Sequence, residues 1–366
     1  REASEKLDEA ASATSNKSLK KFLKARAAAF KSNDYASSDI LWLKLDSTIE
    51  PTIGPYEVYD DMLLGYKAAF ESYIGIKDIE KSKQLMLFTK YLKAIDLSMP
   101  ISKAYKFKRK SQESPISVVN EVFAAGNANA GYTTSAFNLP NDDTIREAYG
   151  SKKILLKNIM DYKFEKIVAR LADLVFEEEQ KKKALLDASF NLVLFHELSH
   201  GMGPGMLLKP EGRISVGEAL RDLYSQIEEA KADASGLYCA LWLMNKGVIE
   251  KELEEEYIKA YYMMLIRSLR NDLQEAHAAG AAMSYNFLEE RGAFKEKSEH
   301  IIIDFEKFKA AHASLLRQYL DIEAAGDYAY ARKFVDRYFH RPAYSALISE
   351  KSHKKGIPFD IFPVFK

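Results

Sequence analysis

The sequence predicts a mainly α-helical protein with a smaller α+β part, arranged as two lobes that flank a cleft. From residue 151 to about residue 337, apolar residues recur at helical spacing almost without interruption. Residues 38 to 145 instead hold short apolar runs separated by Gly, Pro, Asn and Ser. The length of 366 residues permits one large or two medium domains. We therefore expect a mixed lobe at residues 1–145 and a helical lobe at residues 146–366.

Each element of the first lobe has a local signal. Residues 1–35 are rich in Ala and Lys, a composition that favours helix. Three short apolar segments bounded by turn-forming residues are predicted to be strands, namely Leu41–Leu45, Gln84–Phe88 and Ile116–Phe123. The stretch Ala124–Asn141 is rich in Gly and Asn, so we expect a loop and an edge strand there.

The second lobe is predicted to consist of long helices, because apolar residues recur there at intervals of three and four. A Gly-rich link at residues 201–205 ends one of them, either as a plain helix stop or to keep side chains away from a bound ion. The tail at residues 356–363 is expected to be extended. The predicted helices are Asp161–Phe176, Glu179–His200, Val216–Asn245, Lys251–Arg291 with a break, and Asp304–Ala325.

The composition excludes several classes of protein. Lys plus Arg and Asp plus Glu both number 53, so the charge pattern of a nucleic-acid-binding protein is absent. The single cysteine, Cys239, excludes an internal disulfide, and its apolar neighbours predict a buried, inert thiol. No apolar run reaches the roughly 18–20 residues needed to span a bilayer. We expect a globular protein without a membrane span, and the sequence leaves its oligomeric state open.

The segment Phe195–His200 carries the main chemical signal, because it contains H-E-x-x-H at the end of an apolar helical run. Residues four apart lie on one face of a helix, so His196 and His200 can present two imidazoles to one metal ion. Glu197 follows the first histidine and can act as a general base on a water beside that ion. Taken alone, the motif could also be a pair of surface histidines.

Catalytic zinc needs a third protein ligand and an open position. We predict Glu229, which lies in a later helix on the face opposite to the apolar stripe. Asp233, four residues on, shares that face and could accept a hydrogen bond from a ligand histidine. Taken alone, these acids could form a solvated helix face. Together the two motifs predict one zinc ion per chain, held by His196, His200 and Glu229.

These motifs and several other segments resemble the dipeptidyl peptidase III family of zinc metallopeptidases. They are most similar to its shorter bacterial and plant-type relatives, of which the plant form is fused to a Nudix domain. The resemblance covers most of the chain. It implies that Glu229 is the zinc carboxylate and that Glu228 and Asp233 hold the two ligand histidines. It also implies that His277, within Gln274–Ala279, stabilises the transition state.

The resemblance extends to the first lobe. The segment Ile53–Glu57 is similar to one whose Tyr hydrogen-bonds the tetrahedral intermediate, which implies that role for Tyr56. The segment Phe137–Asp143 resembles an N-x-P-N loop whose asparagines hold the substrate backbone, which implies that role for Asn138 and Asn141. Without the resemblance, Tyr56 could be a packing residue and the asparagines could be turn residues.

The chain departs from the better-known members in two ways. They carry H-E-x-x-G-H, one residue longer than the motif here, whereas the five-residue form suits regular helical ligation. They also have an acid two residues before the Tyr, which grips the amino group of the substrate. Gly54 occupies that position here, so Glu57 or another acid would have to replace it.

The resemblance implies hydrolysis of short peptides, with release of N-terminal dipeptides, by a cytoplasmic enzyme. The chain begins without Met, so export to the periplasm is an alternative. Two other functions are open, namely a zinc-binding scaffold without peptidase activity and a zinc hydrolase of another amide or ester. The intact Glu197 argues against the scaffold, because a scaffold needs no general base.

Overall fold

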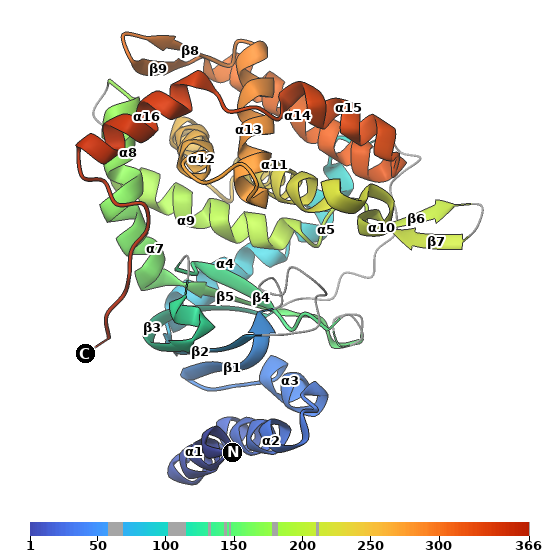
Figure 1. The fold of residues 1–366 in the computed structure, drawn as a ribbon, viewed down its shortest axis with the longest axis vertical. Coiled ribbons are helices and arrows are strands. Elements are labelled where there is room, and N and C mark those ends of the chain that lie inside the picture. Colours follow the sequence, from blue (N-terminus) through green and yellow to red (C-terminus); the bar gives the residue numbers. More distant parts are fainter. Residues whose placement is uncertain are drawn as a thin grey trace. The chain divides into compact units, whose positions relative to one another are not determined.

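The computed structural model of the chain describes residues 1–57, 69–101, 115–130, 133–142, 145, 148–177, 182–209 and 212–365. These residues form two compact units (Figure 1). The sheet unit contains the described residues within 1–90, 110–162 and 360–366, and the helical unit contains those within 91–109 and 163–359. The predicted fold class, mainly α with a smaller α+β part, is confirmed.

The units do not coincide with the predicted lobes at residues 1–145 and 146–366. Contacts group residues 148–162 and 360–365 with the sheet unit, because a strand and the start of a helix in the first of these segments pack on the sheet. Residues 91–101 are grouped with the helical unit. The division into two lobes as independent domains stays a prediction.

A five-stranded mixed sheet forms the centre of the sheet unit, in the order β1-β2-β3-β5-β4. Strands β3 and β5 are parallel and the other neighbouring pairs are antiparallel. Within the described residues, β1 and β4 are therefore the edge strands. The strands are β1 (Ile49–Glu57), β2 (Ala69–Lys77), β3 (Ile116–Gly126), β4 (Ala136–Leu139) and β5 (Lys152–Leu156).

Helices complete the core of the sheet unit. The predicted N-terminal helix is split into two that pack on each other, and Asn16 caps the second by accepting a hydrogen bond from the backbone N–H of Leu19. Phe22 and Trp42 from these helical segments share a buried core with Tyr73 of the sheet. The helices are α1 (Glu2–Ala13), α2 (Lys17–Ser32), α3 (Ala36–Leu43), α4 (Ile79–Thr89) and α7 (Lys157–Lys163).

Two of the three predicted strands are wrong. Leu41–Leu43 ends α3, and Gln84–Phe88 lies inside α4. Short apolar runs fit a strand or one face of a helix equally well, and capping decides here, because the Asp78 side chain accepts a hydrogen bond from the backbone N–H of Lys81 and starts α4. The third predicted strand, Ile116–Phe123, is confirmed as β3.

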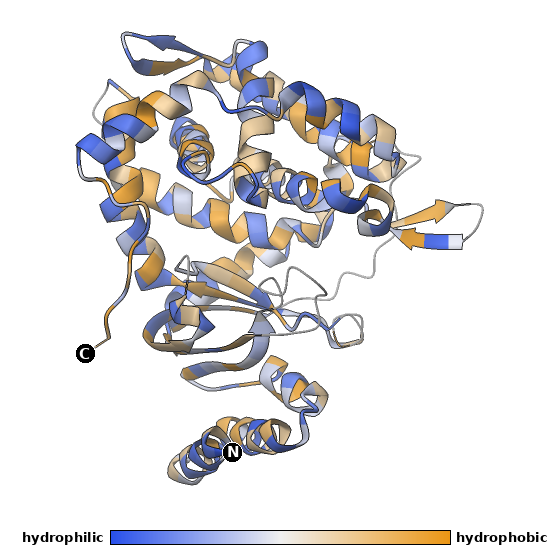
Figure 2. Cartoon of the chain, viewed as in Figure 1, coloured by the Kyte–Doolittle hydropathy of each residue, from blue (hydrophilic) through white to orange (hydrophobic). Residues whose placement is uncertain are grey.

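The described part of each predicted helix is largely helical, with the expected break between α12 and α13. The predicted helix Val216–Asn245 is interrupted at Arg221, which has a positive φ, and residues 179–181 of the predicted helix Glu179–His200 lie outside the described residues. Apolar and polar residues alternate along α9, which packs against α11 and α12 (Figure 2). The tail after α16 contains neither helix nor strand in its described part. The helices are α5 (Leu92–Ser98), α8 (Ala169–Val175), α9 (Lys182–Ser199), α10 (Val216–Leu220), α11 (Tyr224–Asn245), α12 (Glu254–Ser268), α13 (Ala276–Glu290), α14 (Phe305–Ala325), α15 (Tyr328–Tyr338) and α16 (Ala343–Lys354).

Shorter elements link these helices. A π-helical turn joins α7 to α8, and single 3₁₀ turns precede α11 and α12. Two hairpins complete the unit, β6 (Met206–Lys209) with β7 (Gly212–Ser215), and β8 (Phe294–Lys297) with β9 (His300–Ile303). A search of the described residues found no helix with the length and apolar character required to cross a bilayer.

Candidate metal centre and active site

Helix α9 presents both histidines of the motif. Its apolar residues Phe195 and Leu198 are buried, which turns the opposite residues toward α11. His196 lies within the helix and is buried, whereas His200 directly follows the last helical residue and is partly buried. The two rings meet edge to face, with centroids 4.8 Å apart.

Helix α11 supplies carboxylates that fix the orientation of both rings. The Nδ1 atom of His196 lies 2.6 Å from Oδ1 of Asp233, and Nδ1 of His200 lies 2.9 Å from Oε1 of Glu228. Carboxylates accept hydrogen bonds, so each Nδ1 carries a proton, and the neutral form of each ring keeps a lone pair on Nε2 for a metal ion. Glu228 and Asp233 therefore lie at the positions that their predicted support of the two histidine rings requires.

The Nε2 atoms of both rings lie close to one carboxylate oxygen of Glu229. The two Nε2 atoms are 3.1 Å apart, although neither has a proton to offer the other in this tautomer. Glu229 Oε2 lies 3.2 Å from Nε2 of His196 and 3.8 Å from Nε2 of His200. This oxygen is buried and makes no hydrogen bond within the described residues. His196, His200 and Glu229 could therefore bind a metal ion, and their two nitrogens and one oxygen fit a catalytic zinc site.

The acids also set the charges of the ligands. Burial alone would lower the pKa of His196, but the carboxylates of Asp233 and Glu229 outweigh burial and raise it well above its ordinary value, so a metal ion at Nε2 would displace a proton that the ring otherwise carries at neutral pH. Burial would raise the pKa of Glu229, yet the neighbouring His277, His196 and His200 lower it to about 2. Glu229 is therefore an anion at neutral pH and suits a cation.

His277 lies beside this group. It is the second residue of α13, whose N-terminus is capped by Glu275, since that carboxylate accepts hydrogen bonds from the backbone N–H groups of His277 and Ala278. Nδ1 of His277 is 3.3 Å from Oε2 of Glu229, and its half-exposed ring lies 5.6 Å from that of His196. Glu197 is partly exposed on α9, next to the first ligand.

Two glycines allow these helices to approach closely. A Cβ atom on Gly236 of α11 would lie 3.3 Å from the carbonyl oxygen of Leu192 and 3.4 Å from the backbone N of His196. A Cβ atom on Gly280 of α13 would lie 3.1 Å from both the backbone N and the Cβ of Ala230. Larger residues would separate α9, α11 and α13, which together carry the site.

Known proteins are similar to this chain in sequence and in fold. The model of Peptidase family M49 matches residues 1–220. The chain is also 37% identical, over its whole length, to "Nudix hydrolase 3" of Arabidopsis thaliana. The chain belongs to peptidase family M49. It spans 47% of the length of that Arabidopsis relative.

Solved M49 structures agree over nearly the whole chain. The dipeptidyl peptidase III structure from Caldithrix abyssi superposes with a TM-score of 0.94 at 40% identity, covering 99% of this chain and 70% of that one. The dipeptidyl peptidase III from Corallococcus sp. strain EGB gives 0.89 at 36% identity, covering 99% and 67%. The resemblance to the dipeptidyl peptidase III family is thereby confirmed. These likenesses include α11 and α13, which lie beyond residue 220.

Tyr56 of this M49 chain lies in the core of the sheet unit. Its hydroxyl accepts a hydrogen bond from Nη2 of Arg26 at 2.8 Å and donates one to Oδ1 of Asp39 at 3.0 Å. Burial raises its pKa far above the ordinary value. Both partners, Arg26 and Asp39, are themselves buried, whereas the partners of a tyrosine that meets a substrate must be within its reach. These contacts are those of a structural tyrosine.

The sequence reasoning missed Tyr73. In β2 the acid Glu71 lies two residues before Tyr73. The position two residues before Tyr56 is Gly54, which is not an acid. The Tyr73 hydroxyl donates to Oε2 of Glu71 at 3.2 Å and lies 3.0 Å from Oγ1 of Thr134. The acid-x-Tyr spacing is the signal in the sequence that points to this pair.

The two predicted asparagines lie at an edge of the same unit. Asn138 is in edge strand β4, and its buried Oδ1 atom makes no hydrogen bond within the described residues. The side chain of Asn141 donates to the carbonyl oxygen of Tyr56 at 3.0 Å. The segment from Phe137 to Asp142 is described, whereas Asp143 lies outside the described residues.

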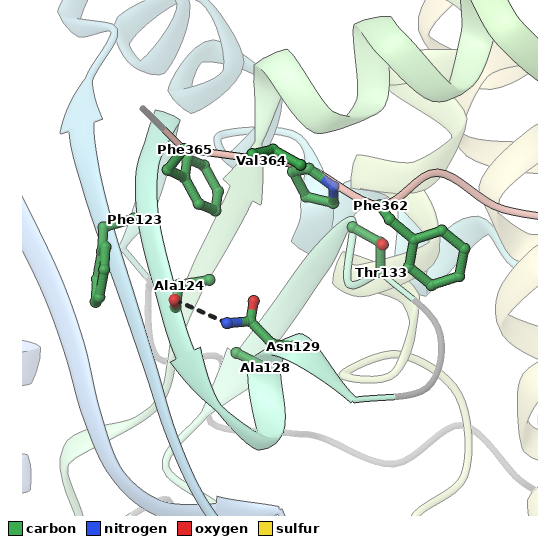
Figure 3. Close-up of a pocket in the computed structure, with 9 residues that line it drawn as sticks. Phe123, Ala124, Ala128, Asn129, Thr133, Phe362, Val364 and Phe365 are labelled. Carbon is green, nitrogen blue, oxygen red and sulfur yellow. Dashed lines mark hydrogen bonds between the residues drawn. The ribbon is translucent and has the colours of Figure 1, made fainter.

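A pocket of about 340 Å³ lies elsewhere in the sheet unit, between β3, the turn after it and the C-terminal tail (Figure 3). Asn129 borders it and donates a hydrogen bond to the carbonyl oxygen of Ala124 at 3.0 Å. The pocket is lined by aromatic, aliphatic and neutral polar residues, with no acid, histidine or cysteine among them. It has no ligand for a metal and no general base, so it is not the candidate active site.

Proposed function

We propose that this chain is a zinc-dependent exopeptidase that releases dipeptides from the amino ends of short peptides. The observation that carries the proposal is the convergence of two imidazole Nε2 atoms on the buried Oε2 atom of Glu229. Membership of family M49 and the likeness to two dipeptidyl peptidase III structures support peptide hydrolysis. The His2Glu donor set supports zinc in preference to Mg²⁺ or Ca²⁺, which select oxygen ligands.

Bound zinc would supply Lewis-acid activation of a water and of the scissile carbonyl. Glu197 would take a proton from the attacking water and return it to the leaving amine, because it neighbours the ligand His196 without belonging to the ligand set. The half-exposed ring of His277, beside Glu229, would donate a hydrogen bond to the oxygen that gains negative charge.

The sheet unit would bind the peptide. Glu71 would be the acid that meets the peptide amino group, the role for which Gly54 has no side chain. Tyr73 would donate a hydrogen bond to the developing oxyanion, the role that the family resemblance implied for Tyr56. Edge strand β4 offers backbone groups for strand addition, and Asn138 on that strand would contact the peptide backbone. Asn141 would support this edge through its hydrogen bond to Tyr56.

A peptide panel tests this function. Unblocked and N-acetylated peptides of two to eight residues are incubated with the wild-type protein, with and without a chelator, and the products are identified by mass spectrometry. We expect dipeptide release from unblocked peptides of four or more residues, lost with chelator and restored by zinc. Equal cleavage of acetylated peptides would indicate an endopeptidase. Absence of any cleavage by zinc-loaded protein would contradict the proposal and favour a scaffold.

A further inference from the structure

Lys231 is a buried lysine of α11 that lies directly behind the metal site. Its side chain is 1% exposed. The Nζ atom donates to Oε1 of Glu228 at 2.8 Å, to the carbonyl oxygen of Met202 at 3.2 Å and to that of Ser199 at 3.3 Å. A buried ammonium group is costly unless such partners compensate it, so these contacts specify one position for it.

Two of these contacts hold the backbone on either side of His200. Helix α9 ends at Ser199, and the turn after it is closed by a hydrogen bond of 2.9 Å from the backbone N–H of Met202 to the carbonyl oxygen of Ser199. Lys231 binds the carbonyl oxygen before His200 and another two residues after it. The second ligand histidine thus lies in the turn that ends α9, and Lys231 connects this turn to α11.

The third contact holds the ring of His200. Oε1 of Glu228 accepts a hydrogen bond from the Lys231 ammonium group and a second one, at 2.9 Å, from Nδ1 of His200. The lysine therefore fixes the carboxylate that fixes the ring. His196 differs, because it lies inside α9 and bonds Asp233 at 2.6 Å without a lysine contact to that acid among the described residues. The support by Lys231 is specific to His200.

We propose that Lys231 is a positioning residue of the metal centre, which acts through Glu228 to aim the Nε2 atom of His200 at the shared ion. The inference rests on the proposed metal site and extends it to a residue that touches neither ion nor substrate. Removing a supporting partner of a metal ligand typically lowers metal affinity about 10- to 100-fold. We expect a loss of this size in Lys231→Met.

A double-mutant cycle tests the route through Glu228. Wild type, Lys231→Met, Glu228→Gln and the double variant are stripped of metal, checked for folding by circular dichroism, and titrated with zinc in competition with a chromophoric chelator. Cobalt-loaded samples give absorption spectra that report the ligand geometry independently of activity. Lys246→Met, an exposed lysine at the end of the same helix, is the control. Should Lys231→Met not fold, Lys231→Gln replaces it, because its amide can still donate to the carbonyl groups.

When Glu228 is present, we expect about a 10- to 100-fold lower zinc affinity in Lys231→Met and a changed cobalt spectrum. In the Glu228→Gln background, the same lysine substitution should change the zinc affinity much less. A folded Lys231 variant with wild-type affinity and spectrum would overturn the inference. An equal loss in both backgrounds would also overturn it, because Lys231 would then not act through Glu228. Failure of wild type itself to bind zinc would instead refute the proposed metal site, so the two failures are distinguishable.

Discussion

Two carboxylates determine the chemistry of the metal site by fixing the protons of the histidine rings. Asp233 and Glu228 each hold an Nδ1–H, so both Nε2 atoms point their lone pairs toward Glu229. The spacing of H-E-x-x-H and the helix face shared by Glu229 and Asp233 predicted these roles from the residues, whereas the role of Glu228 was implied only by the family resemblance. Tyr73 was not predicted, although Glu71, two residues before it on the same strand, is a signal that the sequence contains.

Glu197 is expected to be the general base and not a ligand. Glu197→Gln should lower kcat by about 10²- to 10⁴-fold while the protein still binds one zinc per chain. Peptide turnover and metal analysis on the same sample check both expectations. Loss of zinc from this variant would show that Glu197 belongs to the ligand set after all.

The two tyrosines of the sheet unit can be separated by removing one oxygen atom. Tyr73→Phe should lower kcat by about 10²- to 10³-fold, because it loses the proposed donor to the oxyanion. Tyr56→Phe should instead lower the free energy of unfolding by about 1–3 kcal/mol, because Arg26 and Asp39 lose a buried partner. Kinetics and urea unfolding of both variants decide the matter, and the reverse result would return the catalytic role to Tyr56.

At the scale of elements, helices were predicted better than strands. The long helices repeat their apolar spacing over several turns, so tertiary contacts cannot easily override the pattern. The segments that became α3 and α4 contain only one or two turns, and their apolar runs do not distinguish strand from helix. Strands β1 and β2 were missed because Pro51, Gly54 and Gly75 interrupt the alternation expected of a strand.

The packing of α13 on α11 depends on Gly280. Gly280→Ala would place a Cβ atom 3.1 Å from the backbone N of Ala230 and from the carbonyl oxygen of Gln226, so the helices must separate. We expect a loss of about 1–3 kcal/mol in stability and a lower kcat, because α13 carries His277 one turn away. Unfolding curves and kinetics test this, and wild-type values of both would show that α13 adjusts without displacing His277.

At the scale of the whole molecule, a buried acid of the sheet makes stability depend on pH. Burial raises the pKa of Glu121 from 4.5 to about 7, so the folded state binds more protons than the unfolded state between these values. Protonation of Glu121 therefore adds to the free energy of unfolding, fully below pH 4.5, and this contribution is lost as the pH rises through 7.

Glu121→Gln removes this titration and should melt at a higher temperature than wild type at pH 8, while the two proteins converge near pH 4.5. Thermal unfolding across this range measures the difference. Glu80→Gln is the control, because the Glu80 side chain is 87% exposed. A constant difference between wild type and Glu121→Gln at all pH values would contradict the assignment.

The mainly α class with a smaller α+β part was evident from the sequence, whereas the exact units were not. The predicted boundary at residue 145 is crossed in both directions. Residues 91–101 belong to the helical unit and residues 148–162 to the sheet unit, because their contacts are with residues distant in sequence. Local periodicity contains no information about such contacts.

The most direct test of the central claim is the zinc content of metal-stripped, reloaded protein, measured by mass spectrometry for wild type and for Glu229→Ala. Glu255→Ala, an acid in the first turn of α12, serves as the control. We expect one zinc per chain in wild type and control, and at least a 100-fold weaker affinity in Glu229→Ala. Wild type without stoichiometric zinc, or Glu229→Ala that binds zinc as tightly as wild type, would contradict the account.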